Sequence, residues 1–337
     1  MEYSFASENF APVHPEIMEA LISVNQFHDY SYGADMVSER TKALFRELFG
    51  KGVDVHFTFN GTGANNFGLS VITRPCSAVL CTDVSHLYID ESTAPETFTG
   101  SRLFPVRSVQ GKMLYEELEK SVRRMHSVHN PLPAAVTITQ PTEFGTIYTL
   151  DEVKRIARFC KAKGMCLHMD GARYFNAVAA LQVPLDYFTS NTGVDVLTLG
   201  GTKNGMMFGE AVLFFTGKGR NLRKYQLKRS MQLSSKTRYI AAQFEAMITN
   251  ELWRKIAGHA NSMALIFETE IRNKSNLVVT HPVETNAVFL NMDERMQQRL
   301  NKLVPFYRWG QENAAARFMF SHDIKQQDIH RFITRIN

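Results

Sequence analysis

Short apolar runs alternate with longer amphipathic stretches through the first 215 residues of the chain. Apolar runs that are rich in β-branched and aromatic residues and that break at glycine, proline or polar residues predict strands. Five such runs cover residues 53–59, 77–82, 134–140, 165–170 and 194–200. Several of them are nearly continuous in apolar residues instead of alternating, which is typical of strands buried on both faces. We therefore expect a parallel sheet between layers of helices.

Helix signals lie between these runs. Proline is tolerated in the first turn of a helix, so Pro15 marks one start, and Thr149 and Glu152 have the spacing of a capping box at another. Glycine commonly follows the last helical residue, as Gly50 and Gly164 do in this chain. One predicted helix begins at Pro15, and three others cover residues 36–49, 114–125 and 150–163.

The pattern changes after residue 217. Residues 217–270 are predicted to be mostly helical and include a basic run at 218–230. The remainder predicts two strands, a helix, two strands and a final helix, at residues 277–282, 287–292, 293–303, 306–310, 316–321 and 329–336. We expect an N-terminal segment (1–14), a large α/β domain that carries the ligand-binding residues (15–245) and a small C-terminal α+β domain (246–337).

Composition places the chain among ordinary globular proteins. Its 337 residues are 44% hydrophobic and 21% charged, which excludes disordered and fibrous classes and leaves room for about two domains. The net charge of +5 is small for this length, so we expect neither nucleic acid nor a membrane as a partner. The first residues lack the pattern of a signal peptide, and the longest apolar runs, such as 211–215, are too short to span a bilayer.

The four cysteines, at positions 76, 81, 160 and 166, form no Cys-x-x-Cys pair. Their spacing favours free or buried thiols in a reducing compartment over a disulfide framework or a zinc site. Together with the missing signal and membrane patterns, it predicts a cytoplasmic protein without a bound metal.

Candidate functional residues follow the ends of the predicted strands, where the ligands of open α/β sheets bind. Gly61, Thr62 and Gly63 connect a strand to a predicted helix, so their backbone can approach an anion at the helix N-terminus. The third glycine of a dinucleotide fingerprint is missing because residue 66 is Asn, and no phosphate-loop lysine motif follows. An ordinary tight turn is the alternative.

Later strands end in further candidates. Asp170 ends an apolar strand in HMDGAR, where it serves a ligand, caps a helix or pairs with Arg173. Lys203 lies between glycines in GGTKNG, where restricted solvent would lower its pKa and make it a better nucleophile toward a carbonyl group. A lysine in a surface loop is the alternative. His86 follows the strand at 77–82, and a lone histidine is more often structural than functional.

The combination is more specific than any one of these residues. Pyridoxal phosphate needs a phosphate site, a lysine for a Schiff base and an acid that faces the pyridine nitrogen. The glycine turn, Asp170 and Lys203 supply these groups, and the acid would keep the nitrogen protonated so that the ring accepts electrons. His86 supplies a ring that could stack on the pyridine. The sequence therefore predicts pyridoxal 5'-phosphate as the cofactor.

On these motifs the chain resembles the threonine aldolases among the fold-type I pyridoxal-phosphate enzymes. The resemblance extends from FASENFAP and YGAD near the N-terminus, through ITQ-T-E-G, LHMDG and TKNG, to RWG and ARFMFS at 308–321. It implies an α/β fold with a mainly parallel seven-stranded sheet between helices and a small α+β C-terminal domain. It also implies retro-aldol cleavage of L-threonine, L-allo-threonine or β-phenylserine to glycine and an aldehyde.

The resemblance implies a role for each matching residue. Lys203 matches the Schiff-base lysine, Asp170 the residue at the pyridine nitrogen, and His86 the stacked histidine that also helps in catalysis. The other cofactor-binding residues are Gly61, Thr62, Gly63, Arg173, Thr202 and, across a subunit interface, Arg229. The substrate α-carboxylate would be bound by Ser7, Arg173 and Arg317, since arginine binds a carboxylate through two parallel hydrogen bonds. A solvated basic face is the alternative for Arg229.

One residue departs from the common pattern of the family. Many threonine aldolases carry a histidine where this chain has Glu143, in TQPTEFGT. The base that takes the β-hydroxyl proton is therefore either Glu143, directly or through a water, or His86.

Two other functions remain open at this point. A pyridoxal-phosphate-dependent β-eliminating lyase would release pyruvate and ammonia instead of glycine and an aldehyde. A non-catalytic module would bind RNA or acidic partners through the basic run at 218–230, with strong salt dependence. For either enzyme, the family resemblance implies a homodimer or homotetramer with its sites at the dimer interface.

Overall fold

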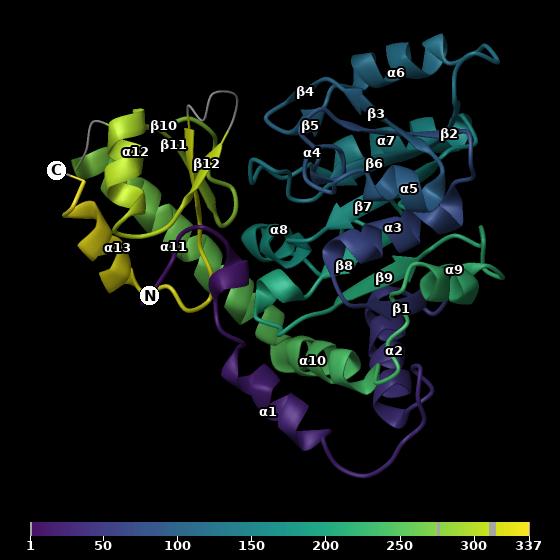
Figure 1. Cartoon of the computed structure of the whole chain (residues 1–337), viewed down its shortest axis with the longest axis horizontal. Helices are drawn as coiled ribbons and strands as arrows, with labels where there is room; N and C mark the ends of the chain where they lie inside the picture. Colours follow the sequence, from purple (N-terminus) through teal and green to yellow (C-terminus); the bar gives the residue numbers. More distant parts are fainter. Residues whose placement is uncertain (1, 275–276, 310–314, 337) are drawn as a thin grey trace.

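The computed structural model describes residues 2–274, 277–309 and 315–336. Its helices and strands form two units of unequal size (Figure 1). The large unit is built on a seven-stranded sheet and the small unit on a four-stranded sheet. The long helix α11 (Leu252–Lys274) connects the two units (Figure 1).

The large sheet has the strand order β1-β9-β8-β7-β6-β2-β3. Its strands are β1 (Asp54–Thr58), β2 (Ser77–Thr82), β3 (Arg102–Val106), β6 (Leu132–Thr139), β7 (Cys166–Gly171), β8 (Val196–Gly200) and β9 (Glu210–Phe214). The neighbours from β8 to β3 pair in parallel, whereas β9 runs antiparallel to both β1 and β8. The predicted seven-stranded, mainly parallel sheet is confirmed. A small hairpin of β4 (Ser108–Val109) and β5 (Lys112–Met113) follows β3.

Helices cover both faces of this sheet, because successive strand residues point to opposite faces. Ala78 and Leu80 pack into the core on one side, and Val79 and Cys81 into the core on the other. The first side is covered by α1 (Pro15–Ser23), α2 (Met36–Phe49), α6 (Tyr115–Arg124), α7 (Leu150–Ala162), α8 (Tyr174–Leu181) and α10 (Arg238–Ile248). The second side is covered by α3 (Gly61–Ile72) and α9 (Arg223–Arg229).

Short helices complete the large unit and carry part of the site. They are α4 (His86–Ile89), α5 (Ala94–Thr99) and the 3-10 helices η1 (Glu8–Phe10), η2 (Thr202–Asn204) and η3 (Thr249–Glu251). The predicted capping box of α7 is confirmed: the Glu152 N–H donates to Thr149 Oγ1 at 3.2 Å, and the Thr149 N–H donates to Glu152 Oε2 at 2.6 Å. The predicted helix start at Pro15 and the predicted strand at 77–82 match α1 and β2.

The small sheet is antiparallel, with the order β10-β11-β13-β12. Its strands are β10 (Val278–Val279), β11 (Ala287–Asn291), β12 (Tyr307–Trp309) and β13 (Ala315–Met319), and its helices are α12 (Glu294–Asn301) and α13 (Gln326–Ile333). Val288, Leu290 and Phe318 pack with the helices on one face. Phe289 and Arg317, paired across the strands, belong to the opposite face, which is turned toward the large unit.

The predicted domain division between residues 245 and 246 stays a prediction, and it falls inside α10. Met1 of the predicted N-terminal segment and Gly310 of the predicted strand 306–310 lie outside the described residues. All four cysteines are free thiols, as predicted. Within the described residues, no helix has both the length and the apolar character needed to cross a membrane.

Candidate active site

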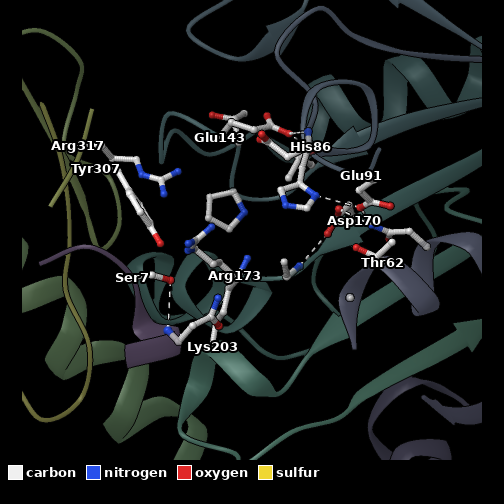
Figure 2. A pocket seen from close by; sticks show the side chains of 18 of the residues that line it. Ser7, Thr62, His86, Glu91, Glu143, Asp170, Arg173, Lys203, Tyr307 and Arg317 are labelled. Atoms are coloured by element: carbon white, nitrogen blue, oxygen red, sulfur yellow. Dashed lines mark hydrogen bonds and ion pairs between the residues drawn. The ribbon is translucent and has the colours of Figure 1, made fainter. Parts of the chain in front are cut away.

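A cavity of about 370 Å³ opens at the end of the large sheet where β6 and β7 finish. Its walls come from the strand ends, the N-terminal segment and the small sheet (Figure 2). The predicted site residues that line it are Ser7, Gly61, Thr62, His86, Glu143, Asp170, Arg173, Lys203 and Arg317. Those that lie outside its lining, among the residues described, are Gly63, Thr202 and Arg229.

The N-terminus of α3 forms one end of the cavity. The side chain of Asn60 caps this helix and accepts a hydrogen bond from the Gly63 N–H at 2.8 Å. In the described structure the N–H groups of Gly61 and Thr62 have no hydrogen-bond partner, so they remain available to an anion at the positive end of the helix. Gly63 allows close packing, since a Cβ atom at this position would overlap the side chain of Gln232.

Asp170 ends β7 beside this helix, and its carboxyl group is buried. Its Oδ1 accepts a hydrogen bond from the Ala172 N–H at 3.0 Å, and its Oδ2 accepts one from Asn65 Nδ2 at 2.9 Å. Asn65 Oδ1 in turn accepts a hydrogen bond from the Thr198 hydroxyl at 2.8 Å. These bonds fix the direction of the carboxyl group. Its predicted alternative partner, Arg173, is engaged elsewhere.

Lys203 lies in η2 directly after β8, in a loop that is tied to the buried carboxyl group of Glu210. The Gly201 N–H donates to Glu210 Oε2 at 2.7 Å, and the Thr202 hydroxyl donates to Oε1 at 2.8 Å. Thr202 therefore shapes the loop. The charge of Arg173, together with burial, lowers the pKa of Lys203. A lysine with a lowered pKa loses its proton more readily and then attacks a carbonyl carbon.

His86 and Glu143 lie close together on another wall (Figure 2). His86 Nδ1 is 2.9 Å from Glu91 Oε1, and this hydrogen bond raises the pKa of His86 against the opposing effect of burial. Glu143 Oε1 accepts hydrogen bonds from the His86 N–H at 3.1 Å and from the Thr139 hydroxyl at 2.7 Å. Burial nevertheless raises the pKa of Glu143 to about 7, so its carboxyl group can gain or lose a proton near neutral pH.

Arg173 is bound by Glu8. Arg173 Nε and Nη2 lie 2.6 and 2.9 Å from the two carboxylate oxygens of Glu8, and Asn286 Nδ2 donates to one of these oxygens at 2.7 Å. Burial alone would raise the pKa of Glu8, but the charge and hydrogen bonds of Arg173 outweigh it and lower the pKa to about 2. The buried pair joins the N-terminal segment, the end of β7 and the small unit.

Arg317 reaches the cavity from β13 without a carboxylate partner among the described residues. Its Cζ lies 4.3 Å from the centre of the Trp309 ring and 5.2 Å from that of the Tyr307 ring. Its Nε is buried and has no hydrogen-bond partner in the described structure. Burial lowers the pKa of Arg317 to about 10, which still leaves the guanidinium charged at neutral pH. A charged guanidinium without a carboxylate partner is suited to bind the carboxylate of a ligand.

The remaining predicted residues are placed differently. Ser7 lines the cavity, and its Oγ accepts a hydrogen bond from the Asn9 N–H at 3.2 Å, so its own hydroxyl proton can be donated to a ligand. Arg229 is exposed on α9, away from the cavity lining. Its contact with a cofactor across a subunit interface stays a prediction.

Several residues that shape the site received no role from the sequence. They are Glu8, Asn65, Glu91, Glu210, Tyr307 and Trp309. Glu8 lies within FASENFAP, directly after Ser7, and Asn65 lies one helical turn after Gly61. Their positions inside these motifs were the available signal. Glu91 and Glu210 lie in no motif.

Together these groups match an elongated organic ligand. The helix end of α3 suits an anionic group, Asp170 suits a protonated ring nitrogen, and Lys203 suits a carbonyl carbon. Arg317 suits a carboxylate at the opposite wall (Figure 2). Over residues 2–274, 277–309 and 315–336, no group of three or more His, Cys, Asp or Glu side chains could hold a metal ion.

Comparison with known proteins agrees with this chemistry. The low specificity L-threonine aldolase of a Pseudomonas species is 38% identical over 334 residues, which cover 98% of this chain and 96% of that enzyme. The enzyme of the same name from Pseudomonas aeruginosa is 38% identical over 321 residues, covering 95% and 92% of the two chains. A solved threonine aldolase structure from Leishmania major has a TM-score of 0.92 at 27% identity, covering 99% and 98% of the two chains.

The family assignment rests on how much of the chain is matched as well as on the degree of sequence identity. The family model of the beta-eliminating lyases matches residues 4–295, which includes the strand ends, the N-terminal segment with Ser7 and Glu8, and Lys203. The relatives named threonine aldolases extend the match along almost the whole chain. The similarity of the chain to the threonine aldolases extends along nearly its whole length, and the family model covers most of it. The chain therefore belongs to the beta-eliminating lyase family.

Proposed function

We propose that this protein is a pyridoxal-phosphate-dependent aldolase that cleaves a β-hydroxy-α-amino acid to glycine and an aldehyde. L-Threonine and L-allo-threonine are the first candidate substrates, followed by β-phenylserine. The observation that carries the proposal is the placement of Asp170, Lys203 and the N-terminus of α3 around one cavity, with the unpaired guanidinium of Arg317 in its facing wall. The names of the relatives that match the chain along its length support the same reaction.

The residues present fit pyridoxal 5'-phosphate. The free N–H groups of Gly61 and Thr62 would bind its phosphate, and the carboxylate of Asp170, held in place by Asn65, would accept the pyridine N–H. Lys203 Nζ would hold the cofactor covalently. When bound, the protonated ring withdraws electrons from the bond that breaks at the substrate Cα.

The small sheet would bind the substrate carboxylate. Arg317 offers a guanidinium fork without a carboxylate partner among the described residues, and the Ser7 hydroxyl can donate a further hydrogen bond. Arg173 contributes its positive charge, while its Nε and Nη2 stay on Glu8. Binding of the substrate carboxylate at this wall would fix the position of the substrate relative to Lys203 and Asp170. The bond between its Cα and Cβ would thereby be oriented for cleavage.

Cleavage requires a base for the β-hydroxyl proton, and two side chains of this chain qualify. His86 can accept a proton at its ring nitrogen, and Glu143 at its carboxylate, whose pKa is about 7 because of burial. Both line the cavity. Lys203, whose pKa is lowered by Arg173 and burial, can then exchange a proton at Nζ with the Cα of the product.

The proposal extends to the assembly and its location. Exposed apolar side chains gather on the segment that leads into the first turn of α2 and around α9, and patches of this kind often mark interfaces. They are Phe27, Tyr30, Tyr32, Met36, Tyr225 and Met231. A homodimer or homotetramer would cover them and could bring Arg229 to a neighbouring site. Free thiols are compatible with the reducing cytoplasm.

The test combines absorption spectra with product analysis. The purified full-length protein is mixed with pyridoxal 5'-phosphate, freed of unbound cofactor, and given L-threonine. We expect visible absorption from bound cofactor and release of glycine and acetaldehyde in equal amounts. Ammonia and a 2-oxo acid would instead assign a β-elimination. A protein that stays colourless and inactive with excess cofactor would refute the proposal.

A further inference from the structure

We propose that Glu91 is a positioning residue that holds His86 with its free ring nitrogen toward the cavity, where it accepts the β-hydroxyl proton. The inference rests on the proposed aldolase reaction and adds a residue that lies outside the cofactor and substrate contacts described so far. It stands on a chain of hydrogen bonds that connects His86 to Asp170 through Glu91 and Asn65.

The first step is the burial of Glu91. Its side chain has no exposed surface, whereas the ring of His86 is 43% exposed and lies at the cavity. Glu91 Oε1 is 2.9 Å from His86 Nδ1 and accepts a hydrogen bond from Asn65 Nδ2 at 3.0 Å. A buried carboxyl group that touches both an amide donor and a catalytic candidate is an orienting group, because it has little freedom to move.

The second step fixes which ring nitrogen carries the proton. The Asn65 amide is oriented by the Thr198 hydroxyl, which donates to its oxygen, and by Asp170, which accepts from its nitrogen. Asn65 therefore donates to Glu91 Oε1, and because an ionised carboxylate can only accept hydrogen bonds, His86 Nδ1 is the donor to it. The neutral ring then carries its proton on Nδ1. Its Nε2 keeps a lone pair on the side of the cavity (Figure 2).

The third step concerns the charges around the ring. Glu91 and Asp170 favour protonated His86, whereas burial and Lys203 oppose it, and the pKa of His86 is raised on balance. Glu143 contacts the same residue from behind, since its Oε1 accepts the His86 backbone N–H at 3.1 Å. A base whose pKa is raised above its usual value holds a transferred proton better, and the negative charge of Glu91 stabilises the imidazolium that forms.

Both candidate bases keep one acceptor atom without a partner among the described residues. Glu143 Oε1 accepts hydrogen bonds from the His86 backbone and from Thr139, while its Oε2 is buried and has no partner. In the imidazole the free acceptor is Nε2, and Glu91 holds this ring and not the carboxyl group of Glu143. Glu91 is therefore expected to act on the reaction only through His86.

The first experiment is a pH titration of Glu91→Gln. Its matched control is Glu117→Gln, which replaces a partly exposed glutamate on α6 that pairs with Lys120. In nuclear magnetic resonance spectra of the cofactor-loaded full chain, we expect the His86 pKa to fall in Glu91→Gln and to stay unchanged in the control. The acidic limb of the kcat profile should move to lower pH with it. At its plateau, kcat should fall by roughly 10- to 100-fold, within the range that general acid–base groups contribute, while KM changes by less than about threefold.

The second experiment combines Glu91→Gln with His86→Asn. If Glu91 acts through His86, the added substitution should change kcat of the His86→Asn enzyme by less than about twofold, because the partner is already lost. An equal loss in both backgrounds, or an unshifted His86 titration, would overturn the inference.

The third experiment does not depend on how the variants fold. Nitrogen-15 spectra of the wild-type protein should show a neutral His86 protonated at Nδ1, and a ring protonated at Nε2 contradicts the inference. These ring measurements are independent of which products are released. A wild-type enzyme without aldolase activity would refute the proposed function, yet leave the His86 titration to decide the role of Glu91.

Discussion

Two of the arginines that line the cavity, Arg173 and Arg317, are held in opposite ways. In the wall formed by the large sheet and the N-terminal segment, Arg173 makes two hydrogen bonds to the buried carboxylate of Glu8. In the wall formed by the small sheet, Arg317 lies against the rings of Tyr307 and Trp309, and its Nε has no partner among the described residues. Arg173 thus has a carboxylate partner within the chain, whereas Arg317 has none among the described residues.

The difference indicates two different roles. Removing one partner of a buried ion pair is strongly destabilising, since the other charge is left uncompensated. A partly buried guanidinium without a carboxylate partner costs stability in the free protein, and such groups persist where a ligand supplies the partner. The wall at the sheet edge is thus built to stay fixed, whereas the wall of the small sheet is built to receive an anion.

The largest expected effect comes from the fixed wall. Lys203→Ala removes the amine that would hold the cofactor and should abolish aldehyde release. After treatment with borohydride, which makes the bond to the lysine permanent, the cofactor should stay attached to the denatured wild type but not to this variant, because the amine that forms the bond is missing. Lys218→Ala, an exposed lysine, serves as the control. Activity equal to the wild type in Lys203→Ala would remove the role given to this residue.

The second effect tests the receiving wall. Arg317→Met should lower kcat/KM by about 100-fold, since two charge-assisted hydrogen bonds together contribute roughly 3 kcal/mol. The same variant should not unfold at a lower urea concentration, because it removes a partly buried charge that has no carboxylate partner among the described residues. Arg317→Lys keeps the positive charge but lacks the forked guanidinium, so its kcat/KM should lie between the values of the wild type and of Arg317→Met. Steady-state kinetics and urea unfolding measure both properties.

A matched control separates the loss of a ligand contact from the loss of surface charge. Arg272→Met removes an exposed arginine that pairs with Glu268 on α11. It should leave kcat/KM unchanged. If Arg317→Met lowered stability while leaving KM unchanged, Arg317 would be a structural residue like Arg173, and the contrast between the walls would be lost.

Much of the fold could be predicted from local patterns. Continuous apolar runs predicted β2, β7 and β8 because buried parallel strands need apolar residues on both faces. The sequence did not predict β3, which carries Arg102 and Pro105, since proline removes a ladder donor. The position of β3 at the edge of the sheet explains why a proline is tolerated there.

The residues of the site also fall into those that the sequence could predict and those that it could not. Asp170 and Lys203 could be predicted because they follow apolar strands, whose ends collect at one edge of the sheet. Glu8 could not, because its partner Arg173 is 165 residues away in the chain and only the tertiary fold brings them together. Arg317 came from the family resemblance alone. Its neighbours Tyr307 and Trp309 share its face through the strand register, which the sequence does not show.

The third effect tests whether the Arg173 pair is structural. Glu8 has a lower pKa in the folded protein, about 2, than its ordinary value of 4.5, so its ionised form stabilises the fold above that ordinary value. The shift corresponds to about 3 kcal/mol, which is lost as the pH falls from 4.5 toward 2. Glu8→Gln should therefore unfold at clearly lower urea concentration than the wild type at pH 7.

The effect of Glu8→Gln on catalysis should be smaller than its effect on stability. Because the substrate carboxylate is assigned mainly to Arg317, kcat/KM should fall by no more than about tenfold, or roughly 1.4 kcal/mol. Glu268→Gln, on the surface of α11, is the matched control for both measurements. A stable Glu8→Gln variant with a strongly raised KM would place the ligand contact at Arg173 instead.

The smallest effect concerns the ring beside Arg317. The Trp309 ring lies 4.3 Å from the guanidinium carbon, and a cation–π contact of this kind contributes about 0.5–2 kcal/mol. Trp309→Leu removes the ring but leaves an apolar side chain, so KM should rise by about 3- to 10-fold with little change in kcat. Trp309→Phe keeps an aromatic face and should change KM less.

The order of these two variants decides what Trp309 does. The ring also packs against Phe289 and Phe144, with centroid distances of 6.0 and 6.4 Å, so a purely structural role would lower the urea midpoint of both variants. A role in holding the guanidinium predicts a graded rise in KM without a shift of the midpoint. Equal KM values for Trp309→Phe and Trp309→Leu would contradict it. In that case the unpaired arginine would be held by the strand alone, and the receiving wall would depend on backbone register instead of on its aromatic rings.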